Sequence, residues 1–297
     1  LNAEGVELKL QAAPRAIGVF LGLQSTFHPL MAFPSYIAIA DLPLEQRLTA
    51  LRAPGMKEKM LAETPVKLAG PDTSIPPMTD SMIAMTELLA AKMFRLSPDG
   101  SGRLDYEQPY ENSAAAKAQM LGESVWSVLY DWLLEDDGLS MIYFPAYNYT
   151  DMNYNAVHTM LTDENALPGL SDGGAHVGFI CDASFPTYLL SYWARDRKDK
   201  KIELSRAVQM LTADGADYLG LTDRGRLKEG LRADINIIDH DKLDLKMPSM
   251  VCDLPAGGQR LLQPVSGYRA TFVKGEKVIA NDQVTAARPG RLVRAGR

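Results

Sequence analysis

Residues 167–176 have the sequence Leu-Pro-Gly-Leu-Ser-Asp-Gly-Gly-Ala-His, a short apolar run followed directly by a carboxylate and two glycines. We predict that residues 167–171 form a strand and that Asp172 lies at its carboxyl end. In barrels of parallel strands, catalytic groups lie at this end. Gly173 and Gly174 allow a sharp turn and a close approach to a ligand. Asp172 is therefore the first catalytic candidate, although Asp-Gly-Gly alone is more often an ordinary turn.

The segments before Gly230 alternate between strand and helix patterns. We predict strands at residues 6–10, 17–23 and 141–144, and helices at residues 82–94, 124–137, 153–162, 204–211 and 212–220. Thr212 is expected to cap the last of these helices. Residues 28–80 contain eight prolines, which indicates an irregular segment with short helices. The strand–helix–strand order implies parallel strands joined by crossovers.

After Gly230 the pattern becomes all-β. Residues 233–239 alternate strictly, and residues 270–273 and 277–280 flank a hairpin turn. We therefore predict an α/β domain in residues 1–224, with a helical insertion at residues 28–138, and a small β-rich domain in residues 225–297.

Composition limits the classes of partner. The 297 residues carry a net charge of −6, which gives no electrostatic case for nucleic acid or an anionic membrane. No apolar run approaches the roughly 18 residues that span a bilayer. The two cysteines match no zinc or redox spacing. We expect a cytoplasmic protein with a small-molecule ligand, although the chain begins with Leu1 and a targeting segment could precede it.

Other candidate site residues are single side chains with two possible roles. His176 could orient a substrate or support a metal, or be an ordinary polar loop residue. Asn148 follows the predicted strand 141–144 and could line a pocket or pack within a loop. The four histidines include no His-x-His and no His-Glu-x-x-His pattern, so they do not by themselves predict a metal enzyme.

Residues 99–107 resemble the middle of an EF-hand loop. That loop needs an acidic residue at its first position and a bidentate Glu at its twelfth. Ser97 and Gln108 occupy these positions, so we predict a solvated turn and no calcium site.

Three later stretches, together with residues 167–177, carry a family resemblance. They are Gly-Arg-Leu-Lys-Glu-Gly-Leu-Arg-Ala-Asp-Ile-Asn-Ile-Ile-Asp at 225–239, Ser-Gly-Tyr-Arg-Ala-Thr-Phe-Val-Lys-Gly-Glu-Lys-Val at 266–278, and Pro-Gly-Arg-Leu-Val-Arg at 289–294. In this order they resemble the D-aminoacylase-like branch of the amidohydrolase superfamily. The resemblance implies the C-terminal part of a (β/α)8 TIM-like barrel with a small β-sandwich. It also implies metal-dependent hydrolysis of carbon–nitrogen bonds other than peptide bonds, as in N-acyl-D-amino-acid deacylases.

The resemblance assigns Asp172 as the general base, able to touch the metal, which is usually zinc. The family's His-x-His and other ligands have no counterpart here, so we expect them upstream of Leu1. A catalytic zinc needs about three protein ligands. We therefore expect these 297 residues alone to be poorly soluble, to hold no zinc and to be inactive, with residues 17–23 and 167–170 exposing apolar surface.

The resemblance also implies an arginine after the aspartate that holds the substrate carboxylate. No Arg or Lys lies between Gly173 and Tyr188. Arg15 is one candidate for this clamp, and an exposed surface arginine is the alternative. Two alternatives to deacylation stay open: cyclic amide hydrolysis or deamination within the same superfamily, and a non-catalytic fragment that lacks the metal site.

Overall fold

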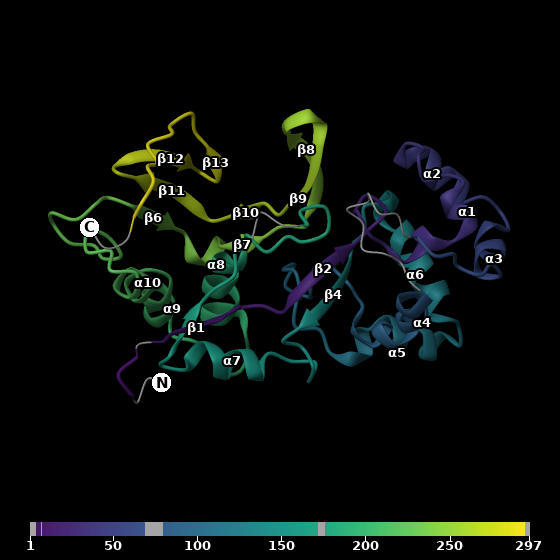
Figure 1. Cartoon of the computed structure of the whole chain (residues 1–297), viewed down its shortest axis with the longest axis horizontal. Helices are drawn as coiled ribbons and strands as arrows, with labels where there is room; N and C mark the ends of the chain where they lie inside the picture. Colours follow the sequence, from purple (N-terminus) through teal and green to yellow (C-terminus); the bar gives the residue numbers. More distant parts are fainter. Residues whose placement is uncertain (1–3, 7, 69–79, 172–175, 295–297) are drawn as a thin grey trace.

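A computed structural model describes residues 4–6, 8–68, 80–171 and 176–294 of the chain (Figure 1). Its central feature is a parallel pair of strands, β1 (Leu10–Ala12) and β5 (Ala166–Pro168). Leu10 pairs with Ala166 and Ala12 with Pro168, so both strands end at one edge. The strand predicted before Asp172 is confirmed but is shorter, and the strand predicted at residues 6–10 begins only at Leu10. The two strands pair over three residues, which limits the length of both.

A second sheet has the order β2-β4-β3 and consists of β2 (Ile17–Leu21), β3 (Phe94–Arg95) and β4 (Ile142–Tyr147). Both of its pairings are antiparallel, so the expectation of parallel strands is wrong here. The physical reason is that several short helices, and not one crossover helix, connect β2 to β4. The chain therefore returns beside the end of β2, where Ile142 pairs with Leu21.

Strand β2 separates two hydrophobic cores. Phe20 packs in the core around Trp193, whereas Leu21 packs in the core around Leu129. Both β2 side chains are almost fully buried, so the expectation that residues 17–23 expose apolar surface is wrong. Leu170 does remain 37% exposed.

The core around Leu129 belongs to a helical region on the right of Figure 1. Its helices are η2 (Pro29–Ala32), α1 (Pro34–Ile37), α2 (Leu44–Leu51), α3 (Met56–Leu61), α4 (Asp80–Leu89), η3 (Ala90–Lys92), η4 (Tyr110–Asn112), α5 (Ala114–Leu121), α6 (Val125–Leu134) and η5 (Asp136–Gly138). The short helices expected between residues 28 and 80 are confirmed. Helix α6 begins where the Ser124 hydroxyl accepts a bond from the Ser127 N–H. It ends three residues earlier than predicted because Glu135 is extended and Asp136 has a φ of 51°.

The second group of helices surrounds Trp193, which is fully buried. It contains α7 (Asn155–Thr162), α8 (Phe185–Tyr188), the π-helix η6 (Leu189–Asp196), α9 (Leu204–Leu211) and α10 (Ala213–Tyr218). Helices α7, α9 and α10 were predicted, whereas the helical segment formed by α8 and η6 was not. Thr212 precedes α10, but its hydroxyl donates 2.7 Å back to the Val208 carbonyl and does not cap the helix.

From Ile235 onward the described residues form strands and short 3-10 turns, as the sequence predicted. The elements are β6 (Ile235–Ile238), η7 (His240–Lys242), β7 (Asp244–Leu245), β8 (Ser249–Leu254), η8 (Pro255–Gly257), β9 (Gly258–Leu262), β10 (Val265–Ser266), β11 (Tyr268–Val273), β12 (Glu276–Ala280) and β13 (Gln283–Val284). One sheet has the order β13-β12-β11-β6 and lies above α9 and α10 in Figure 1. The predicted hairpin turn is confirmed, with Lys274 and Gly275 at φ values of 53° and 80°.

Candidate functional site

The carboxyl ends of β1 and β5 bring two candidate segments to one edge of the parallel pair. The Gly169 N–H donates 2.9 Å to the Ala12 carbonyl just beyond the paired residues. Arg15 therefore follows one strand end and Ser171 follows the other. Asp172, Gly173 and Gly174 lie outside the described residues, so their predicted roles stay predictions. Their neighbour Ser171 donates its hydroxyl 3.2 Å to the Ala183 carbonyl.

The segment from residue 176 to residue 184 is held by distant parts of the chain. The Thr26 and Phe20 N–H groups donate to the Gly178 and Phe179 carbonyls at 3.0 and 2.8 Å. The Leu261 N–H donates 2.7 Å to the Val177 carbonyl. Strand β2, the loop after it and strand β9 thus all fix this segment.

His176 begins this segment in a left-handed conformation, with a φ of 49°. Its carbonyl accepts bonds from the N–H groups of Phe179 and Ile180 at 3.0 and 2.9 Å. Its imidazole is exposed, with its centroid 5.3 Å from that of the Phe179 ring. The imidazole is therefore accessible to a ligand, and its substrate role stays a prediction.

Arg15 has no exposed surface, so the interpretation as a surface arginine is wrong. Its Nη2 lies 3.2 Å from Asp182 Oδ1 and 3.1 Å from the Cys181 carbonyl oxygen. The guanidinium carbon lies 4.1 Å from the Tyr106 ring centroid and 4.7 Å from that of Phe185. Its Nε and Nη1 atoms have no hydrogen-bond partner within the part of the chain that the structure describes.

The charge on Arg15 is retained despite its burial. Burial opposes the charge, but Tyr106, Tyr143 and Asp182 outweigh that effect, so the pKa of Arg15 lies above its ordinary value. The predicted carboxylate clamp at Arg15 stays a prediction, although a substrate would have to displace packed rings to reach it.

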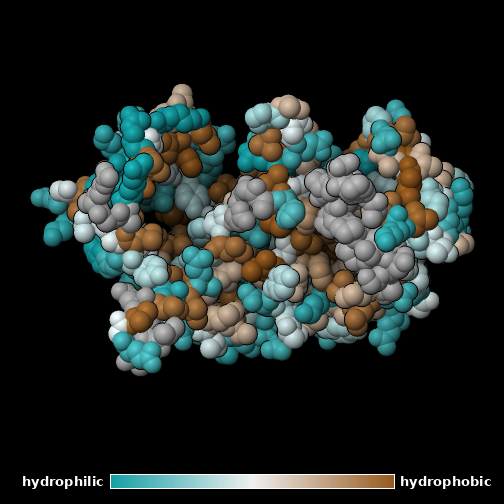
Figure 2. All heavy atoms as spheres, in the orientation of Figure 1, coloured by the Kyte–Doolittle hydropathy of each residue, from teal (hydrophilic) through white to brown (hydrophobic). Residues whose placement is uncertain are grey.

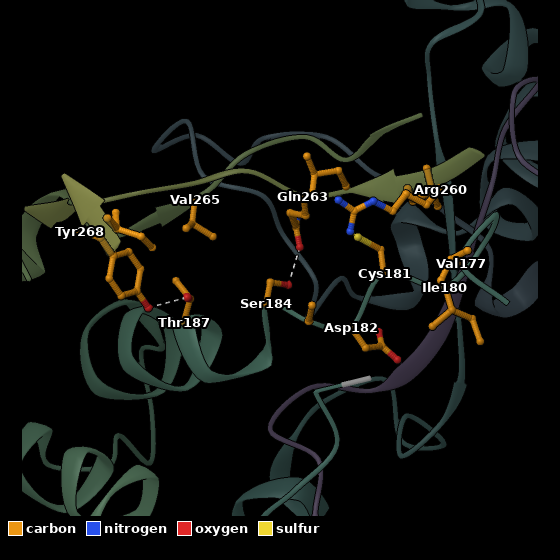
Figure 3. A pocket seen from close by; sticks show the side chains of 14 residues that line it. Val177, Ile180, Cys181, Asp182, Ser184, Thr187, Arg260, Gln263, Val265 and Tyr268 are labelled. Atoms are coloured by element: carbon orange, nitrogen blue, oxygen red, sulfur yellow. Dashed lines mark hydrogen bonds between the residues drawn. The ribbon is translucent and has the colours of Figure 1, made fainter. Parts of the chain in front are cut away.

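A cavity of about 250 Å³ lies between this segment and strand β9 (Figure 3). Its polar lining includes Cys181, Asp182, Ser184, Thr187, Arg260 and Gln263. The Ser184 hydroxyl donates 2.6 Å to Gln263 Oε1, which ties the segment to the β-rich part of the chain. Sequence patterns did not identify this wall, because Ser184 and Gln263 lie far apart in the chain and neither belongs to a local motif.

The charges at this cavity are already engaged. Arg260 Nε and Nη2 each lie 2.7 Å from a carboxylate oxygen of Asp253. Burial raises the pKa of the Cys181 thiol to about 11, so the thiol is neutral at pH 7. The cavity therefore offers hydroxyl, amide and thiol groups more readily than a free cation.

A second, larger cavity of about 600 Å³ lies between α9 and β6. Its walls are mainly apolar and include Leu204, Val208 and Ile235. In Figure 2 this face is hollowed below the β-rich part, with hydrophobic residues around the hollow. His240 also lines it, and a ring nitrogen of His240 lies 2.9 Å from the Leu190 carbonyl oxygen.

Two further sequence candidates lie on loops. Asn148 follows β4 with a φ of 63°, is partly buried and lines neither cavity, so its binding role stays a prediction. Asp99 Oδ1 accepts bonds from the N–H groups of Ser101 and Arg103 at 2.7 and 3.2 Å. A turn therefore forms at residues 99–103, but the prediction of a solvated turn through residue 107 is wrong, because Tyr106 is 1% exposed and Glu107 pairs with the buried Arg197.

The described residues do not fit the zinc site that the resemblance implies. No group of three His, Cys, Asp or Glu side chains that could hold a metal occurs among them. We therefore derive no catalytic step that involves a metal from these residues. Within the described ranges there is also no helix long and apolar enough to cross a membrane.

Residues 99–279, which make up more than half of the chain, match the sequence model of the amidohydrolase family. The chain belongs to this family. A curated relative, N-acyl-D-aspartate deacylase from Alcaligenes xylosoxydans xylosoxydans, is 30% identical over 100 residues, which cover 34% of this chain and 18% of that protein. The resemblance to the D-aminoacylase-like branch is thereby confirmed.

Solved structures of amidohydrolases also match. A D-aminoacylase structure is 22% identical, with a TM-score of 0.39, over 70% of this chain and 38% of that one. An N-acyl-D-glutamate deacylase from Bordetella bronchiseptica, solved with zinc and a phosphonate inhibitor, is 20% identical, with a TM-score of 0.36, over 71% and 39%. The amidohydrolase chain spans less than two fifths of the length of each of these relatives.

Proposed function

We propose that the complete protein is an amidohydrolase that cleaves linear amide bonds, as an N-acyl-D-amino-acid deacylase does. Membership of the family supports this proposal, as does the similarity to an N-acyl-D-aspartate deacylase. The observation that carries it is the parallel β1–β5 pair. Because both strands end at one edge, Ser171 and the adjoining Asp172 follow the carboxyl end of a parallel strand, where barrel enzymes have their catalytic groups.

Asp172 acts as the general base in this proposal. Its carboxylate takes a proton from the attacking water and passes it to the leaving nitrogen. His176, Gly173, Gly174 and Asn148 contact the substrate. Zinc is expected in the complete enzyme, with most of its ligands outside the described residues.

The proposal includes a finer description of the fold. Strands β1 and β5 form part of a (β/α)8 barrel, with a helical insertion at residues 28–138. The β-rich part from residue 225 contributes to a β-sandwich. A crystal structure of the complete protein would test both statements directly.

The decisive experiment replaces Asp172 in the complete enzyme. Asp172→Asn should leave the fold intact and lower kcat for an N-acyl-D-amino acid at least about a hundredfold, the usual scale for a lost general base. Asp241→Asn, at an exposed position on a 3-10 turn, is the matched control and should keep wild-type turnover. Near-normal turnover in a folded Asp172→Asn enzyme would overturn the proposal. Zinc content, measured in the same preparations, tests the expected metal dependence.

A further inference from the structure

We infer that Arg15 is a positioning residue, which fixes the segment that follows the predicted base through its bonds to Cys181 and Asp182. This inference rests on the function proposed for Asp172. It assigns Arg15 a role other than holding the substrate carboxylate. Asp182 is the partner through which Arg15 fixes this segment.

The first step is the place of the contact. Arg15 lies at the carboxyl end of β1, and its Nη2 bonds to residues 166 and 167 positions later in the chain. The adjacent Ala183 carbonyl accepts the hydroxyl of Ser171, which directly precedes Asp172. The guanidinium therefore bonds to the residue next to Ala183, where this segment is joined to Ser171 after β5.

The second step is the chemistry of the contact. The bonds from Phe20, Thr26 and Leu261 to the same segment are ordinary backbone hydrogen bonds. Arg15 adds a charged contact that has no exposed surface. Charge-assisted hydrogen bonds are about twice as strong as neutral ones. This contact should therefore limit movement of the segment more than any one of the backbone bonds.

The third step is the enclosure of the guanidinium. The rings of Tyr106 and Phe185 lie within 5 Å of its carbon, at 4.1 and 4.7 Å. Asp182, whose side chain is 2% exposed, already supplies the carboxylate that an arginine of this kind binds. A substrate carboxylate would have to compete with Asp182 and move both rings. The planar guanidinium suits stacking on these rings while Nη2 bonds to both acceptors, whereas a lysine ammonium does not reproduce the stacking.

Arg15→Lys in the complete enzyme tests the inference by kinetics. The charge is kept, so Asp182 stays paired, but the planar group that lies against the Tyr106 and Phe185 rings is lost. We expect kcat to fall at least about tenfold, because a misplacement of about 1 Å can cost about a hundredfold in rate. KM should change less than about threefold, and the loss should be the same for an acyl-D-amino acid and its uncharged amide analogue.

Arg197→Lys is the matched control. Arg197 is also buried, pairs with Glu107 at 3.0 Å and stacks on Trp193, but it does not bond to residues 176–184. Arg197→Lys should lower the thermal unfolding midpoint and leave kcat of the folded enzyme unchanged. If Arg15→Lys behaves in the same way, Arg15 is merely structural. If its loss appears in KM and only for substrates with a free carboxylate, Arg15 is a clamp. Either result overturns the inference.

Hydrogen exchange separates this inference from the proposed function. The Phe179 and Ile180 amides, both bonded to the His176 carbonyl, should exchange faster in Arg15→Lys than in the wild type, whereas amides of α6 should not change. Unchanged exchange at Phe179 and Ile180 would overturn the inference whatever the role of Asp172. If Arg15→Lys does not fold, the double variant Arg15→Met/Asp182→Leu removes both charges and allows the same two measurements.

Discussion

Nη2 of Arg15 and Oδ1 of Asp182 lie 3.2 Å apart, with side-chain exposures of 0% and 2%, and join the end of β1 to the segment after β5. An ion pair in such a site is expensive to break from one side, because the remaining charge stays buried. Removing one partner should therefore destabilise the protein much more than replacing both partners by apolar residues.

Arg15→Met should lower the free energy of unfolding of the complete protein by about 3–5 kcal/mol, since the buried Asp182 carboxylate would lose its bond to the Arg15 guanidinium. Arg15→Met/Asp182→Leu should cost much less, because neither charge remains. Denaturant unfolding of the two variants measures the difference. Lys57→Met is the control at an exposed pair, with Asp131 at 2.7 Å, and should cost about 0–1 kcal/mol. Equal losses for Arg15→Met and Lys57→Met would contradict the argument.

Substrate specificity should differ from that of an enzyme with a buried carboxylate clamp. No cation occurs between Gly173 and Tyr188, and Arg260 beside the cavity is already paired with Asp253. Replacing an acyl-D-amino acid by its uncharged amide analogue should lower kcat/KM less than about tenfold. A clamp would make the same change cost about 2–5 kcal/mol.

The same substrate panel, which should also include a cyclic amide, tests two alternatives. A strong requirement for the free carboxylate that disappears in Arg15→Lys would place the clamp at Arg15. Preferred turnover of the cyclic amide would replace linear amide hydrolysis by another reaction of the superfamily.

His28 should make the protein less stable in mild acid. Burial, and secondarily Arg47, lowers the pKa of His28 from 6.5 to about 3. The folded protein therefore keeps the imidazole neutral while the unfolded chain takes up a proton. The stability of the fold is therefore not reduced by His28 above pH 6.5. Below that pH, His28 reduces the free energy of unfolding progressively as the pH falls toward 3. One pKa unit corresponds to about 1.4 kcal/mol, so the loss should reach about 2 kcal/mol at pH 5.

Thermal unfolding between pH 7 and pH 5 measures this effect. His28→Phe should show a smaller decrease over that range, because it removes the titrating group from the same buried position. The Nδ1 atom of His28 has no hydrogen-bond partner among the described residues, so the aromatic replacement breaks no bond at that atom. An identical pH dependence in the wild type and His28→Phe would show that other groups are responsible.

The elements that the sequence predicted well are those fixed by neighbouring residues. The turn at Lys274 and Gly275 needs left-handed backbone at both positions, and glycine at the second meets that need locally. The apolar face of α7 repeats within eight residues, so its limits were also predicted closely. The helical segment at α8 and η6 was not predicted from the sequence.

The arrangement around the site could not be predicted in the same way. Arg15 and Asp182 are 167 positions apart, and neither has a neighbour that indicates the other. The antiparallel pairing of β2 with β4 likewise depends on the path of the helices between them. Asp172 was identified by a local feature, a strand followed by a carboxylate and two glycines, whereas the contacts that hold its neighbours come from distant segments.

The contact between β1 and β5 gives the sharpest test of the proposed site. A Cβ added at Gly169 would lie 2.5 Å from Gln11 Cβ and 2.9 Å from its Cγ. Because Gln11 Cβ is fixed to the strand backbone, Gly169→Ala must move the end of β5 away from β1. Overpacking of this kind costs about 1–3 kcal/mol. The same movement should displace Ser171 and Asp172, so kcat of the complete enzyme should fall together with its unfolding midpoint.

Gly215→Ala is the matched control, since Gly215 lies in α10 with nothing within 4 Å of an added Cβ. It should stabilise the protein by about 0.5–1 kcal/mol, because alanine is the better helix former, and leave kcat unchanged. Gln11→Gly in the Gly169→Ala background removes the opposing Cβ and should restore part of the lost turnover. If Gly169→Ala has wild-type kcat and stability, the ends of β1 and β5 are not in contact, and the strand edge does not position Asp172.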